Sequence, residues 1–130
     1  MILKYAKNII NEESKGLKKL SASLNIKFTE AIKILSNIKG NVIITGVGKS
    51  GFIAKKIAST MTSTGTPATF IHPTEASHGD LGMIDSRDLI LCISYSGETE
   101  EITQILPIIK KTKAKIISIT GKPKSSLAQL

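Results

Sequence analysis

The sequence is poor in aromatic residues, which make up 4% of its 130 residues, and it has no tryptophan. With so few rings, a surface that stacks nucleic-acid bases is a poor expectation. Cysteine occurs once, at Cys92, so an internal disulfide is excluded, which suits a reducing cytoplasm. No apolar stretch reaches the roughly 18 residues that a membrane-spanning helix needs. We therefore expect a cytoplasmic protein with an aliphatic core and no membrane partner.

Positive charge is in excess, since 18 basic residues against 10 acidic ones give a net charge of +8. Such a balance favours anionic partners, among them nucleic acid, membrane surfaces and phosphorylated metabolites. The lysines are scattered in pairs and singly, without a run of five or more, and there is no RNA-binding signature. Much of the charge is expected to lie on solvated helix faces, and nucleic acid is not expected as a partner.

The order of apolar patterns predicts an α/β fold. Helical spacing indicates a helix over 1–24 and a second one through Ile38, ended by Gly40. Short apolar runs then alternate with further helices, of which one carries Pro107 and the last begins near Ser125. The predicted strands are 42–45, 68–71, 89–94 and 116–119. Continuous apolar strands between helices are typical of a three-layer, doubly wound parallel sheet. We treat 1–130 as one domain, which looks unfinished at its C-terminus.

Three predicted strands end in small polar turns that lead toward helices. These turns are 45–51, 94–99 and 120–126. Glycine allows close approach of the backbone, and helix N-termini attract anions. The hydroxyls of Ser50, Ser96 and Thr99 add donors without a fixed charge. One such turn is more often a helix cap than a site. The first two are richer in glycine and hydroxyls than capping needs, and neighbouring strands would place them side by side.

The first turn can also be compared with nucleotide-binding motifs. Gly46, Gly48 and Gly51 match G-x-G-x-x-G, but the phosphate loop G-x-x-x-x-G-K-S would need glycine at Ile43. A dinucleotide fold also needs an acidic residue after the second strand, where the chain has His72 and then proline. Nicotinamide chemistry is therefore the weaker interpretation.

Both histidines, His72 and His78, fall in the segment 72–80, which we expect to be a loop at the ligand edge. Histidines in surface loops are usually only polar. A metal bound by both and a carboxylate is conceivable, although the spacing fits no standard zinc pattern. Functional residues are nevertheless frequent in loops at such an edge.

Three glutamates, Glu98, Glu100 and Glu101, open the helix that follows Ser96. The helix dipole favours acidic residues in a first turn, which explains two of them without any function. One that faces the cleft can act as a general base.

Together these segments resemble the SIS (sugar isomerase) fold and, within it, the bacterial arabinose 5-phosphate isomerases. The motifs that carry the resemblance are 46–51, 63–67, 72–83, 94–99 and 119–121. The Ser-x-Ser-Gly turn at Ser94 is shared by SIS domains in general, whereas 72–83 is far more specific. The resemblance implies the interconversion of ribulose 5-phosphate and arabinose 5-phosphate through an enediolate, toward the sugar acid of lipopolysaccharide.

The resemblance also implies roles for individual residues. Lys49 and Glu101 fall on the catalytic lysine and glutamate of the family, and Thr99 stands where close relatives have serine. His72 falls on a position that can take zinc, which turnover does not require, so no cofactor is expected. The positions implied to bind substrate, including the hydroxyls that would hold the phosphate, are Ser50, Gly65, Thr66, His72, His78, Ser94, Ser96 and Thr99.

The same family continues with a strand and a helix that supply another catalytic glutamate and a histidine, usually followed by CBS domains. These lie outside the 130 residues, so activity of this chain alone is in question. A homo-oligomer, by resemblance a tetramer, is expected. The alternative is a sugar-phosphate-binding SIS module without catalysis or an inactive fragment, since SIS domains also serve in regulators.

Overall fold

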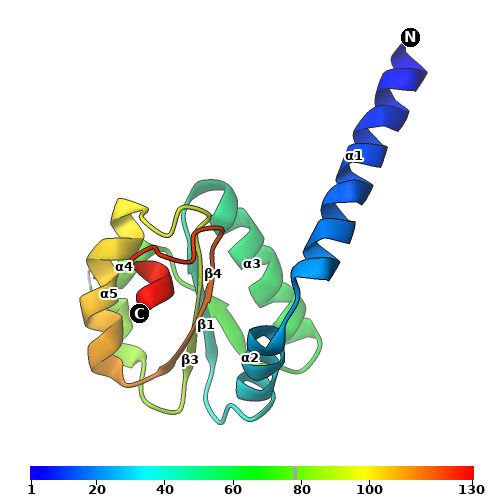
Figure 1. The fold of residues 1–130 in the computed structure, drawn as a ribbon. Helices are drawn as coiled ribbons and strands as arrows, with labels where there is room; N and C mark the ends of the chain where they lie inside the picture. Colours follow the sequence, from blue (N-terminus) through cyan, green and yellow to red (C-terminus); the bar gives the residue numbers. More distant parts are fainter. Residues whose placement is uncertain (78) are drawn as a thin grey trace. The chain divides into compact units, whose positions relative to one another are not determined.

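The computed structural model describes residues 1–77 and 79–130 (Figure 1). The chain divides into two compact units, 1–33 and 34–130. Within the described part of the chain, no helix combines the length and the apolar character needed to cross a membrane.

The first unit is helical. It holds α1 (Ile2–Ser23) and the start of α2 (Ile26–Ser36), which confirms the two helices expected before the first strand. The break between them is local, because the backbone of Leu24 is extended and the Asn25 side chain accepts the Lys27 N–H at 2.9 Å. None of the side chains of α1 is buried.

The second unit is built on a parallel sheet. Its strands are β1 (Val42–Gly46), β2 (Ala68–Phe70), β3 (Leu89–Ile93) and β4 (Lys115–Ile119). They lie in the order β2-β1-β3-β4, and every neighbouring pair is parallel. The two central strands are buried throughout, which explains why their sequences are continuously apolar rather than alternating.

Helices cover both faces of this sheet (Figure 1). On one face, α3 (Gly48–Ser63) packs on Val42 and Ile44, together with Leu35 from the end of α2. On the other face, α5 (Glu100–Thr112) packs on Ile43 and Cys92. The shorter elements are α4 (Pro73–Ser77), η1 (Asp80–Met83) and η2 (Leu127–Gln129). The predicted three-layer, doubly wound α/β fold is confirmed.

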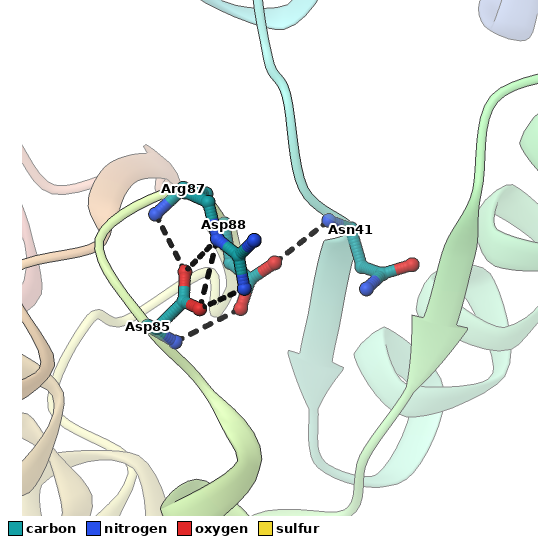
Figure 2. A network of polar contacts seen from close by, with 4 residues as sticks. All are labelled: Asn41, Asp85, Arg87 and Asp88. Atoms are coloured by element: carbon teal, nitrogen blue, oxygen red, sulfur yellow. Dashed lines mark hydrogen bonds and ion pairs between the residues drawn. The ribbon is translucent and has the colours of Figure 1, made fainter.

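A carboxylate closes the amino-terminal edge of the sheet (Figure 2). Asp88 is 6% exposed, and its two oxygens accept the backbone N–H groups of Asn41 at 2.7 Å and Asp85 at 2.9 Å. It thereby fixes the start of β1 against the turn that precedes β3. The Arg87 guanidinium hydrogen-bonds the Asp85 side chain and lowers the pKa of that carboxyl, but this pair is exposed and adds little stability.

Apart from shifts of one or two residues at strand and helix ends, three predictions differ from the structure. The segment expected as a loop after β2 contains α4 and η1, and the helix expected near Ser125 is only the three-residue η2. Glu98 lies in the turn before α5, which begins at Glu100. The elements α4, η1 and η2 have five residues or fewer, too short for a periodic apolar pattern to reveal them.

Candidate functional site

The polar turns meet at the carboxyl edge of the sheet. Because β1 and β3 are paired up to Gly46 and Ile93, the turns after them lie side by side, as predicted. The turn after β4 adjoins them, since the Gly121 N–H donates to the Tyr95 carbonyl at 3.0 Å. His72 follows β2 at the same edge. The strand order reverses between β1 and β3, and such a switch point is where open α/β sheets bind ligands.

The first turn owes its shape to its glycines. Gly48 has φ +57°, a left-handed backbone that favours glycine, and a Cβ placed there would meet nothing within 4 Å. A Cβ on Gly51 would lie 2.8 Å from the Gly46 carbonyl oxygen, so this glycine lets α3 approach β1 closely. The α3 N-terminus has no side-chain cap and no acidic residue in its first turn. Its free N–H groups and positive dipole end suit an anion.

The second turn is held from inside by one hydroxyl. Ser94 is 3% exposed, and its Oγ accepts the Gly97 N–H at 3.1 Å and lies 2.9 Å from the Thr99 Oγ1. Ser94 therefore shapes the turn rather than facing solvent. The Ser96 hydroxyl is exposed, and apart from accepting the Glu98 N–H at 3.2 Å it is open to a ligand.

The third turn supports the second. Glu98 Oε1 accepts the Ser126 N–H at 2.7 Å, and the Leu127 N–H donates to the Gly97 carbonyl at 3.2 Å. The Thr120 hydroxyl donates to the Tyr95 carbonyl at 3.1 Å. The segment after β4 thus holds both ends of the Ser94 turn in place.

The glutamates at the start of α5 have different environments. Glu98 is bound to the third turn, and Glu100 accepts a hydrogen bond from Gln104 at 3.1 Å. Glu101 is exposed, and among the described residues its side chain has no hydrogen-bond or ionic partner. Lys49, at the start of α3, is also exposed. Of the three glutamates, Glu101 is therefore the one whose carboxylate binds no other side chain or backbone group among the described residues.

A small pocket of about 190 Å³ lies between the α3 N-terminus and the end of β2. It is lined by Gly48, Gly51, Phe52, Lys55, Phe70 and His72. The Lys55 ammonium lies 5.1 Å from the centroid of the Phe70 ring. Lys55, Phe52 and Phe70 are not among the site residues predicted from the sequence. Lys55 lies seven residues after Gly48, so helical spacing places the two on one face of α3, and this was the available signal for Lys55.

The histidine positions bear on the zinc prediction. His72 is half-buried, with its ring edge-on to Phe70, and its Nδ1 accepts the Thr74 N–H at 3.3 Å. Only its Nε2 is left for a metal or a substrate. Within the described residues, no three His, Cys, Asp or Glu side chains come together to hold a metal ion. His78 lies outside those residues, so a site that includes it stays a prediction.

Two predicted binding residues lie elsewhere. Gly65 and Thr66 follow the C-terminal end of α3, near the amino edge of the sheet, where the Pro67 carbonyl accepts the Val42 N–H. The 16 residues of α3 separate them from Lys49 by about 24 Å at the usual helical rise. One chain therefore does not bring them to the carboxyl edge, where the structure places Ser50, Ser94, Ser96, Thr99, Glu101 and His72.

The SIS domain model matches residues 34–130. Arabinose 5-phosphate isomerase KdsD of Shigella flexneri is 45% identical over 123 residues, 95% of this chain and 38% of that protein. KdsD of Pseudomonas aeruginosa is 47% identical over 124 residues, which are again 95% of this chain and 38% of that protein. A solved structure, of an E. coli CFT073 protein in complex with arabinose 5-phosphate, superposes with a TM-score of 0.92 at 44% identity, covering 98% of this chain and 68% of the other.

The chain thus spans 38% of the length of these two KdsD relatives. The matched range nevertheless contains all four strands and all three polar turns at the carboxyl edge. The resemblance inferred from the motifs is therefore confirmed by the sequence model and by the fold. This chain belongs to the SIS domain family.

Proposed function

We propose that this chain is the sugar-phosphate domain of an arabinose 5-phosphate isomerase, which interconverts arabinose 5-phosphate and ribulose 5-phosphate. The observation that carries the proposal is the 45% identity, extending over 95% of the chain, with proteins of that name. The related E. coli CFT073 structure holds arabinose 5-phosphate. The product would serve the sugar acid of lipopolysaccharide, in the cytoplasm, without a nucleic-acid or membrane partner.

The phosphate would lie at the switch point between the first two turns. Ser96 and Thr99 supply hydroxyls there, Ser50 adds one from α3, and Ser94 keeps the turn in shape from below. Hydroxyls and backbone N–H groups bind a phosphate without a fixed counter-charge, so the ligand can also leave. The α3 N-terminus, which carries no acid in its first turn, adds favourable electrostatics.

Isomerisation moves one proton between two neighbouring carbons and a second proton from the C2 hydroxyl to the C1 oxygen. Glu101 would take the proton beside the carbonyl, the electron pair of that bond would form the enediolate, and the proton would return to the adjacent carbon. The Lys49 ammonium would stabilise the negative charge that develops on the oxygens. The step is internally balanced and needs no cofactor, although the free Nε2 of His72 is a nitrogen that zinc can bind.

The distance between the two ends of α3 supports an oligomeric enzyme. If Gly65 and Thr66 contact substrate, the chain that supplies them differs from the chain that supplies Lys49, because α3 separates them. A tetramer, as the resemblance implies, provides such neighbours.

The test is to titrate arabinose 5-phosphate into the protein by calorimetry and to assay ribulose 5-phosphate formation. Ser96→Ala should weaken binding about 5- to 150-fold, the effect of a lost hydrogen bond to a charged group. Ser59→Ala, an exposed serine on α3 away from the turns, is the matched control and should bind normally. Equal affinities for both variants would remove Ser96 from the site. Binding without turnover would instead support a non-catalytic SIS module.

A further inference from the structure

A second pocket, of about 190 Å³, lies at the amino-terminal edge of the sheet, away from the polar turns. The residues that line it are Asn41, Ile43, Thr69, Ile71, Met83 and Asp88. None of them belongs to the site assigned to the sugar phosphate. We propose that this pocket binds a small primary ammonium with a branched aliphatic body.

The floor of the pocket follows from the pairing of β1 with β2. Ile43 and Thr69 are Cα partners in that pair, and Ile71 continues it, since its N–H donates to the Ile44 carbonyl at 3.0 Å. The alternation of strand side chains therefore places Ile43, Thr69 and Ile71 on one face of the sheet. Met83, at the end of η1, lines the same pocket and is 74% exposed. Its flexible thioether can adapt to an aliphatic ligand.

Three side chains bring unused hydrogen-bond acceptors to this floor. Asp88 is 6% exposed, and each of its oxygens accepts one backbone N–H, from Asn41 and from Asp85, which leaves a lone pair on each oxygen (Figure 2). Among the described residues, the Asn41 side-chain amide and the Thr69 hydroxyl have no hydrogen-bond partner. An apolar pocket with a few convergent polar groups is the usual form of a small-molecule site.

The charge of Asp88 lacks a cationic partner within the described part of the chain. Arg87, its neighbour in sequence, instead forms an ion pair with Asp85. A buried carboxylate that is bound only by neutral groups favours a cation that can reach it. An ammonium has three N–H donors, and the pocket offers three acceptors, which are the Asp88 carboxylate, the Asn41 Oδ1 and the Thr69 Oγ1.

Other classes of ligand fit this pocket less well. An anion would be repelled by Asp88, and no three His, Cys, Asp or Glu side chains gather to hold a metal anywhere in the described residues. The net charge of +8 on the chain opposes a cation at long range, but salt screens such fields beyond about 10 Å, whereas Asp88 acts in contact. A cavity of about 150 Å³ accommodates benzene, so this pocket suits a ligand of about six heavy atoms.

Titration of the full chain with isoamylamine, followed by nuclear magnetic resonance, tests the site. The backbone N–H signals of Asn41 and Asp85 should shift saturably, because these groups would share Asp88 with the ligand. The expected Kd is about 1–10 mM, a modest ligand efficiency for six heavy atoms. Isoamyl alcohol, which has the same body without the charge, should bind at least about 5-fold more weakly, and isovalerate should not bind. No saturable shift below about 50 mM, or equal binding of amine and carboxylate, would overturn the proposal.

Thr69 carries the mutational test, because Asp88 also fixes the start of β1. Thr69→Val keeps the shape and removes one acceptor, so it should weaken amine binding at least about 5-fold. Thr60→Val, the same change at an exposed position of α3, should leave binding unchanged. Thr69→Phe should fill the pocket and abolish binding of amine and alcohol alike. Unchanged affinity in either Thr69 variant would show that the amine binds elsewhere.

Arabinose 5-phosphate separates this pocket from the sugar-phosphate edge. The five residues of β1 set the two edges about 16 Å apart at the usual rise of a strand. Isoamylamine should therefore bind equally well with and without saturating arabinose 5-phosphate. Competition between the two ligands would place the amine in the sugar-phosphate site and would overturn the separate pocket.

Discussion

Gly97 and Gly48 form a natural pair for testing how the turns at the carboxyl edge are confined. Both have left-handed backbones, with φ +65° and +57°, so alanine at either position is strained by about 1–2 kcal/mol. A Cβ on Gly48 meets open space, whereas one on Gly97 overlaps the Ser125 Oγ and lies 2.5 Å from the Ser125 Cβ. Overpacking of this kind adds about 1–3 kcal/mol.

We therefore expect Gly48→Ala to lower the free energy of unfolding by about 1 kcal/mol, after the roughly 0.4–1 kcal/mol that a stiffer unfolded chain returns. Gly97→Ala should lower it by about 2–4 kcal/mol. Urea unfolding followed by circular dichroism measures both, and the comparison holds where the slope m is unchanged.

A double-mutant cycle isolates the contact. Ser125→Gly removes the atoms that the new methyl group would meet, so Gly97→Ala/Ser125→Gly should recover about 1–3 kcal/mol relative to the sum of the single changes. Gly48→Ala/Ser125→Gly should be additive, because a Cβ on Gly48 has no atom of Ser125 within 4 Å. If the two cycles give the same coupling, or Gly48→Ala is as costly as Gly97→Ala, the third turn does not confine the second in this way.

Three further outcomes are expected. In a version that contains the full length of the isomerase relatives, Glu101→Gln should slow isomerisation roughly 10²-fold or more in a coupled assay, with binding nearly intact, because the amide lacks the base; unchanged turnover would leave Glu101 a first-turn helix charge. Asp88→Ala should lower the unfolding free energy by about 2–4 kcal/mol in urea, because it leaves the N–H groups of Asn41 and Asp85 without their acceptor; a loss below about 1 kcal/mol would mean that water replaces it. Burial raises the pKa of the Cys92 thiol from 9.0 to about 12, so the unfolded chain loses this proton first and stability should fall as the pH rises from about 9 toward 12. Cys92→Ala should flatten that slope, and an unchanged slope would contradict the assignment.

The sequence was sufficient for the layers of the fold, because buried parallel strands such as β3 are continuously apolar and the helices between them are long enough to show a period. It was also sufficient for the meeting of the first two turns, since neighbouring parallel strands end at one edge. It could not show that Glu98 lies before the helix and accepts the Ser126 N–H, because the two residues are 28 positions apart and no local pattern indicates such a contact.

The placement of Gly65 and Thr66 bears on how many chains would form the site. The resemblance assigns them to the substrate, and it does not say whether they and Lys49 reach the substrate from the same chain. The helix length, 16 residues, puts them at the opposite edge of the sheet from Lys49. Predicting that separation needed only the helical rise applied to the predicted helix. A motif can therefore identify binding residues while the number of chains that form the site stays open.

The role of the third turn follows from where its hydrogen bonds go. The backbone N–H groups of Gly121 and Leu127 donate into the Ser94 turn, to the Tyr95 and Gly97 carbonyls, rather than toward the open edge. In addition, the Glu98 carboxylate accepts the backbone N–H of Ser126 in the third turn. A turn held in this way is already ordered before a phosphate arrives, so binding does not have to supply the cost of ordering it. If the Ser94 turn binds the phosphate as proposed, the segment after β4 therefore contributes to ligand affinity through the shape of its neighbour.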